Sequence, residues 1–184
     1  MHIKERSKQE IESRLSVMGD YVKMDYLQRA LKSGLDFDTR KFALLRLAGI
    51  YEGRKMFVEA GKLLKAAADI NTTYKGKIQD YMKSVELFIR GGEFDEADRV
   101  FKQAIVCGNE SEKQEMKENM KKYYITQAEI YQSNDKRNQA KKTYEKLLSL
   151  SLSSYEKNDV QKRLLQLYEK LGLIKEYYSL KQNM

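Results

Sequence analysis

The residues that most often carry catalysis or bind metals are scarce in this chain. Its 184 residues include one histidine, His2, and one cysteine, Cys107. One histidine at the N-terminus excludes Ser-His-Asp and Cys-His catalysis and any metal site built on histidines. Cys107 follows the apolar residues Ala104, Ile105 and Val106. Burial without a neighbouring base raises the pKa of a thiol, so we interpret Cys107 as a structural thiol in the core.

The other residue patterns with a chemical precedent have simpler explanations. Two pairs of carboxylates lie three residues apart on one helix face, Asp95 with Asp98 and Glu115 with Glu118. Two-metal helical bundles use Glu-x-x-His pairs, which need histidines, so these carboxylates are interpreted as solvated helix charges. The Gly91-Gly92 pair lacks the Gly-Lys-Ser/Thr ending of a phosphate loop and is predicted to form a turn. We therefore expect no enzyme activity, no metal and no cofactor.

The composition predicts an all-α fold. Hydrophobic residues make up 41% of the chain and charged residues 34%, and proline and tryptophan are missing. The polar residues are largely Lys, Glu, Gln and Arg, which favour helices. No stretch alternates with a period of two for long enough to form a sheet.

The net charge and the termini bear on partners and location. A formal charge of +8 makes anionic partners plausible. One cysteine points to a reducing compartment. No apolar run approaches the roughly 18 residues that span a bilayer, and the charged N-terminus lacks the apolar stretch of a signal peptide. We expect a cytoplasmic protein with no membrane partner.

Pairs of amphipathic helices recur along the chain. In the segment 44–67, apolar residues follow the spacing i, i+3, i+4, i+7 before Gly53, and a second stripe with helical spacing begins at Phe57. Two helices joined by a few residues form a helical hairpin. The same order of an aromatic, a turn and a small residue returns downstream. Equivalent positions are spaced 36, 37, 43 and 37 residues apart; they are Leu15, Tyr51, Phe88, Tyr131 and Tyr168.

These positions predict a single helical-repeat domain over residues 1–184. Its units are expected at about 5–38, 41–74, 77–110, 117–153 and 157–181, the first degenerate and the last incomplete. Candidate N-caps of the helices are Thr39, Asn71 or Thr72, Asn109 and Ser111, and Ser153 or Ser154.

The hairpins resemble the tetratricopeptide repeat family over roughly residues 41–181, most strongly over 77–110. In that family the first helix carries an aromatic near its end, and the second carries a small residue, an aromatic and an alanine. Phe88, Ala97, Phe101 and Ala104 match these positions. Leu44 and Tyr81 replace the large aromatic of the first turn, the closing proline is missing, and the units exceed 34 residues. The resemblance implies a right-handed α-solenoid of about four hairpins that binds partners.

In such an architecture the first helix of each hairpin lines a concave groove. The mechanism would be recognition of a protein or peptide segment, including an acidic one, by a cytoplasmic scaffold or adaptor. The candidate groove residues are first-helix side chains that the core does not use, and they lean basic: Arg46, Lys83, Glu86, Arg90, Lys122, Glu129, Lys162, Arg163 and Gln166. A family clamp for C-terminal carboxylates also needs Asn residues, and Gly49 and Lys83 stand there instead.

Three alternatives stay open. The chain could be a regulatory domain for a peptide signal or a kinase pathway, although its sequence shows no effector segment. A basic helical-repeat protein could bind RNA or a ribonucleoprotein, helped by the basic stretch Lys113–Lys146. The aromatic stripe of the repeats could then stack on bases, although its helical spacing favours a place in the core; its members are Tyr51, Tyr81, Phe88, Phe101, Tyr124, Tyr131, Tyr144 and Tyr168. The chain could also form a homodimer through its C-terminal end, which includes Tyr177 and Tyr178 and lacks a polar capping helix.

Overall fold

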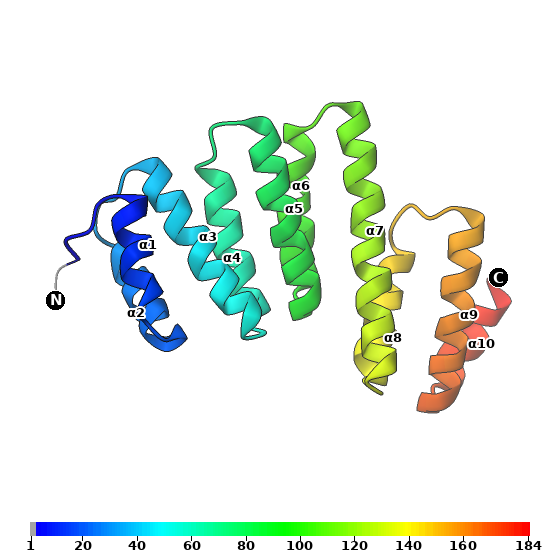
Figure 1. Ribbon diagram of the computed structural model, residues 1–184. Coiled ribbons are helices and arrows are strands. Elements are labelled where there is room, and N and C mark those ends of the chain that lie inside the picture. Colours follow the sequence, from blue (N-terminus) through cyan, green and yellow to red (C-terminus); the bar gives the residue numbers. More distant parts are fainter. Residues whose placement is uncertain (1–2) are drawn as a thin grey trace. The chain divides into compact units, whose positions relative to one another are not determined.

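A computed structural model describes residues 3–184, and this part of the chain is all α-helical with no strand. The ten helices follow one another with short connections (Figure 1). Their bounds are α1 Lys8–Ser16, α2 Asp20–Leu31, α3 Phe37–Gly53, α4 Phe57–Asp69, α5 Tyr74–Gly91, α6 Phe94–Cys107, α7 Glu110–Ser133, α8 Arg137–Leu148, α9 Ser154–Leu171 and α10 Ile174–Gln182. Among the described residues, no helix combines the length and apolarity required to cross a bilayer.

The chain divides into two compact units. Unit 1 extends to Lys113 and holds helices α1–α6, and unit 2 runs from Gln114 to Met184. The boundary falls in the first turn of α7, so most of that helix belongs to unit 2. Within unit 1 the helices pair as α1–α2, α3–α4 and α5–α6, and the turns of these hairpins lie on one edge (Figure 1). The loops that lead from one hairpin to the next lie on the opposite edge of the unit.

Four of the hairpins share the same turn. In each, the carbonyl of an aromatic residue accepts a hydrogen bond from the N–H five residues later, at 2.8–2.9 Å. The residue four positions after the aromatic has positive φ, and the second helix begins six positions after it. This is the geometry of a Schellman-type helix end. The aromatics are Tyr51, Phe88, Tyr131 and Tyr168, and the residues with positive φ are Lys55, Gly92, Asp135 and Gly172.

This shared turn confirms that Gly91-Gly92 forms a hairpin turn. Gly92 has a φ of 80°, a left-handed conformation that costs glycine nothing. The first hairpin differs, because α2 begins five residues after Leu15 and Met18 N–H bonds to the Leu15 carbonyl.

The aromatic stripe lies mainly in the core, as the helical spacing favours. Six of its eight rings are buried, and Phe101 and Tyr131 are half-buried. Three residues into the second helix, Ala60, Ala97 and Ala140 are each fully buried. Two of the buried tyrosines bond to carboxylates through their hydroxyl groups: Tyr81 donates to Asp69 at 2.7 Å and Tyr168 donates to Glu145 at 3.0 Å.

Small residues let α4 and α5 approach closely. A Cβ added to Gly61 of α4 would lie 3.3 Å from the ring of Phe88 in α5. Beside this contact, the Ser84 hydroxyl donates a hydrogen bond of 2.7 Å to the Gly61 carbonyl. Buried hydroxyl groups need such a partner, so Ser84 is tied to the helix it packs against.

The first helices begin earlier than the predicted unit starts at 41, 77, 117 and 157. The caps explain the difference: Asp36 and Thr73 accept from the N–H groups of Thr39 and Gly76, whereas Thr39 itself is buried inside α3. Asn109 and Ser153 were predicted as caps, and each accepts a hydrogen bond from the N–H three residues later. Asn71 instead donates its side-chain amide to Asp80 at 2.9 Å.

Candidate functional site

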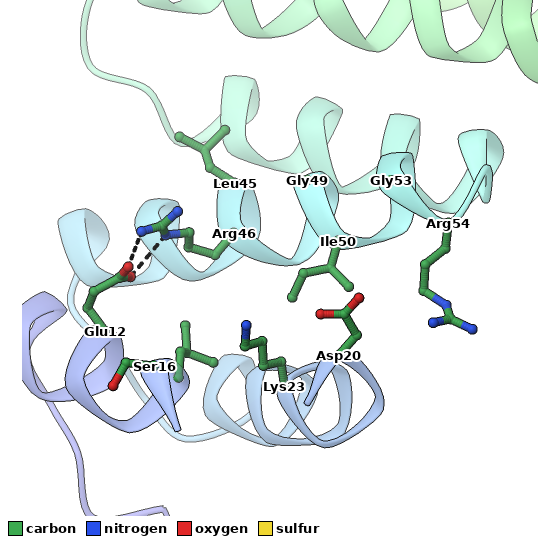
Figure 2. A pocket seen from close by; sticks show the side chains of 11 residues that line it. Glu12, Ser16, Asp20, Lys23, Leu45, Arg46, Gly49, Ile50, Gly53 and Arg54 are labelled. Atoms are coloured by element: carbon green, nitrogen blue, oxygen red, sulfur yellow. Dashed lines mark hydrogen bonds and ion pairs between the residues drawn. The ribbon is translucent and has the colours of Figure 1, made fainter. Parts of the chain in front are cut away.

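A hollow of about 610 Å³ opens on unit 1 between α3 and the α1–α2 hairpin. Its floor is α3, and its far side is formed by α1 and the first turn of α2 (Figure 2). Figure 2 shows Asp20, Lys23 and Ile50 pointing into this space. The lining residues are Glu12, Leu15, Ser16, Asp20, Lys23, Leu45, Arg46, Gly49, Ile50, Gly53 and Arg54. The hollow therefore combines apolar contacts with charges of both signs.

An ion pair closes one end of the hollow. The Nε of Arg46 donates to Glu12 at 3.0 Å, and a second guanidinium nitrogen contacts the other carboxylate oxygen (Figure 2). This two-point geometry is the favourable one for Arg with a carboxylate. Both side chains are about half exposed, so the pair fixes the position of the two helices more than it adds stability.

At the other end, Arg54 covers an exposed aromatic ring. Its guanidinium carbon lies 4.0 Å from the ring centre of Tyr21, and it also donates a hydrogen bond to the Tyr21 hydroxyl. Such stacking holds a guanidinium in place while leaving part of its hydrogen-bonding capacity free.

At two positions the floor of the hollow has no side chain. Gly49 and Gly53 are exposed on α3, and a Cβ added to either would meet nothing within 4 Å. Neither residue has positive φ, so neither the backbone conformation nor packing requires glycine. Gly49 lies inside α3, where glycine costs about 1 kcal/mol relative to alanine, and Gly53 is the last residue of the helix. No packing contact or backbone conformation in the described part of the chain offsets this cost.

The next first helix shows what these glycines replace. At the spacing of 37 residues that relates Tyr51 to Phe88, Gly49 and Gly53 correspond to Glu86 and Arg90 of α5. Those two side chains cover the surface of α5 and are paired with each other at 3.2 Å. The surface of α3 is therefore open at the two positions where side chains cover the surface of α5.

Glu86 and Arg90 belong to a network of four charges that joins α3 to α5. Glu52 accepts from Lys83 at 3.0 Å and from Arg90 at 2.7 Å, and Lys83 also bonds to Glu86 at 3.0 Å. The guanidinium of Arg90 further lies 4.2 Å from the ring centre of Phe57. Burial raises the pKa of Glu52, but the hydrogen bonds and charges of Lys83 and Arg90 outweigh it, so this pKa lies below its usual range. Burial likewise lowers the pKa of Lys83, and its two carboxylate partners raise it overall.

We expect Glu52→Gln to lower the free energy of unfolding by about 1–2 kcal/mol at pH 7, because two cations lose a charged partner. A carboxyl whose folded pKa is depressed stabilises the fold above its unfolded pKa of about 4.3. That contribution is lost as the pH falls through the folded pKa. The difference between wild type and variant should therefore be full above pH ~4.3 and vanish at lower pH. Urea unfolding between pH 7 and the acid limit of the fold measures it.

Asp25→Asn is the matched control. Asp25 pairs with Arg29 at 2.9 Å, but both side chains are more than half exposed. Exposed pairs contribute little, so this variant should stay within about 0.5 kcal/mol of wild type. A difference for Glu52→Gln that does not change with pH would contradict the assignment.

Unit 2 has a similar network of charges, which joins α7 to α9. Arg163 bonds to Glu129 at 3.1 Å and to Asp159 at 2.9 Å. It also donates to the Tyr144 hydroxyl at 3.3 Å, and that hydroxyl donates to Gln132 at 2.7 Å. Burial raises the pKa of Tyr144 although the charge of Arg163 opposes the change. The hydroxyl stays protonated and available as a donor.

Six of the nine predicted groove residues therefore pair within their own unit, and most of these pairs join one first helix to the next. The partners are 34 residues apart for Glu12–Arg46 and Glu129–Arg163, and 31 apart for Glu52–Lys83. The six residues are Arg46, Lys83, Glu86, Arg90, Glu129 and Arg163. Lys122, Lys162 and Gln166 are exposed on α7 and α9. The role of all nine in partner binding stays a prediction.

The sequence reasoning missed the acidic partner Glu12 and the open floor of α3. An acid placed 34 residues before a basic residue at two separate points of the chain was a detectable signal for the pairs. Two glycines four residues apart in an amphipathic helix were the signal for the floor.

Of the residues considered for catalysis or metal binding, Cys107 and the two carboxylate pairs lie among the described residues. His2 lies outside the described residues. Cys107 is half-buried at the end of α6, not in the core, because Val106 beside it is exposed and only Ala104 of that turn is buried. In residues 3–184 no cluster of three or more His, Cys, Asp or Glu is arranged to hold a metal ion. Glu118 is used by Gln114 and Lys121 of its own helix.

Comparison with known proteins adds no assignment to these features. No protein-family model matches the chain, and no curated protein sequence matches it.

Proposed function

We propose that this chain is a non-enzymatic scaffold that binds a segment of another protein in the hollow of unit 1. The observation that carries the proposal is the open floor at Gly49 and Gly53, where glycine has no role in the fold. Glycine without a conformational or packing role marks a place where another backbone approaches closely. A hollow of about 610 Å³ has the size of a site for a few side chains of a bound segment.

The lining predicts the chemistry of the segment. Leu45 and Ile50 offer apolar contacts, and Arg54 offers positive charge at the end opposite the Glu12–Arg46 pair, with Lys23 and Asp20 between them (Figure 2). A segment with an apolar residue and a nearby carboxylate would satisfy both. The tetratricopeptide-like arrangement, a right-handed stack with a groove lined by first helices, is the architecture we propose for this function. A reducing compartment such as the cytoplasm suits a chain with one cysteine.

Gly49→Leu tests the proposal. The new side chain would occupy part of the hollow, and its Cβ would meet nothing within 4 Å. Peptides selected from a random display library on the wild-type chain should bind it in solution and lose at least about tenfold in affinity with the variant. Fluorescence anisotropy with the labelled peptides measures the affinity, and circular dichroism checks that the fold is kept.

Lys102→Leu provides the control, because it places the same side chain on the exposed surface of α6 in the same unit. It should leave the peptide affinity unchanged. Selected peptides that bind Gly49→Leu as tightly as wild type would show that the segment binds elsewhere.

A further inference from the structure

Two exposed aromatic rings lie at equivalent positions of unit 1, on a different surface from the hollow. Phe37 and Tyr74 are the first residues of α3 and α5, 37 residues apart, and each is 73% exposed. Both helices begin on the edge of the unit that carries the loops between hairpins (Figure 1). In unit 2, Tyr155 occupies the second position of α9 and is 85% exposed.

The fold does not account for these rings. Aromatic residues are weaker helix formers than Glu or Gln, and a carboxylate at a helix start would gain from the helix dipole. Rings this exposed contribute no burial to the core. The buried aromatics of the repeat occupy other positions, such as Tyr51 and Phe88. An aromatic that recurs at a helix start, exposed each time, fits a role in contact with a partner.

The acidic groups on this edge are already engaged. Asp36 accepts from the Thr39 N–H at 2.9 Å as the cap of α3. Asp80 bonds to Lys41 at 3.2 Å and accepts from Asn71 at 2.9 Å. Asp38, on the other side of Phe37, is 86% exposed at its side chain and lies 3.7 Å from Lys8.

Basic groups beside Tyr74 are not engaged in this way. Lys75 and Lys77 lie one and three residues after Tyr74, and within residues 3–184 neither forms an ion pair. Lys75 is exposed. The edge therefore presents two planar rings, and the lysines beside Tyr74 carry positive charge that no ion pair among the described residues compensates.

We propose that this edge of unit 1 binds single-stranded nucleic acid, with bases stacked on Phe37 and Tyr74 and phosphates next to Lys75 and Lys77. Single strands expose base faces that stack on aromatic rings while the backbone follows positive charge. A duplex hides these faces, so it would use only the charges. A lipid surface fits less well, because Phe37 stands between two carboxylates, Asp36 and Asp38, that would enter the headgroup layer with it.

Binding of a fluorescein-labelled oligouridine of about 15 nucleotides, measured by anisotropy in about 50 mM salt, tests the edge. Phe37→Ala and Tyr74→Ala should each weaken binding about fivefold or more, and Phe37→Tyr and Tyr74→Phe should keep it, because they keep the ring. The ring variants should leave the slope of log affinity against log salt unchanged. Lys75→Gln should reduce that slope by about one.

Tyr21→Ala is the matched control, since this ring is 70% exposed at the start of α2, on the opposite edge of the unit. It should bind like wild type. Equal affinity of wild type and the Phe37→Ala/Tyr74→Ala double variant would overturn the proposal, as would wild-type binding to a duplex that matches binding to the single strand. Co-sedimentation with anionic vesicles that depends on the two rings, without oligouridine binding, would assign the edge to a lipid surface instead. Gly49→Leu should not affect oligouridine binding, so this proposal and the segment-binding scaffold fail independently.

Discussion

Phe88→Ala should lower the free energy of unfolding by about 3–5 kcal/mol, the loss typical of a fully buried phenylalanine. Phe88 is 1% exposed. Its ring packs on Gly61 of α4, and its carbonyl accepts the hydrogen bond that closes the α5–α6 turn. A shift of α4 to close the cavity would disturb the Ser84–Gly61 hydrogen bond between the two helices. Urea unfolding followed by circular dichroism measures the change.

Phe37→Ala makes the same substitution at an exposed ring and serves as the control. It should change the free energy of unfolding by no more than about 0.5 kcal/mol. A large loss at Phe37 would show that this ring supports the fold and would remove the argument that it serves a partner. A loss below 1 kcal/mol at Phe88 would contradict the packing described for α4 and α5.

A single substitution, glycine to alanine, should have opposite effects at two positions of unit 1. At Gly91, the last residue of α5, the new Cβ would lie 2.7 Å from Cγ2 of Val58. Valine has one preferred rotamer in a helix and cannot turn away, so we expect a loss of about 1–3 kcal/mol from overpacking. At Gly49 the Cβ meets nothing, and alanine should raise the free energy of unfolding by about 1 kcal/mol through helix propensity.

Thermal and urea unfolding of the two variants beside wild type would measure both signs. A stabilised Gly49→Ala chain with weaker peptide binding would connect the helix cost of this glycine with its proposed function. If Gly49→Ala destabilised the chain instead, the residue would have a structural role that its open surroundings do not show.

The repeats and the core were predictable because they follow from periodicity. Apolar residues at helical spacing identified the stripe, and the recurrence of Tyr51, Phe88, Tyr131 and Tyr168 located four hairpin turns that the structure shows to be alike. The first residues of the helices were harder to predict from the sequence. A run such as Asp36-Phe37-Asp38-Thr39 holds more than one possible cap, and only the fold decides that Thr39 is buried while Asp36 caps the helix.

The partners of the surface charges could not be read from the repeat pattern alone. Arg46, Lys83 and Arg163 look like free groove cations when each repeat is considered separately. Their acids, Glu12, Glu52 and Glu129, lie on the preceding first helix, so the pairing depends on how hairpins stack. The hollow was missed for a related reason, because a missing side chain carries no signal of its own in a hydrophobicity pattern.

The ion pairs between first helices also have a mechanical meaning for unit 1. Glu12–Arg46 ties α1 to α3 beside the hollow, and Glu52–Lys83 ties α3 to α5. A bend of unit 1 would change the distances between α1, α3 and α5, so these ion pairs resist such a bend. Their stiffness depends on ionic strength, since the screening length falls from about 8 Å at physiological salt to about 3 Å at 1 M. We therefore expect high salt to weaken the restraint that these pairs place on the helices beside the hollow.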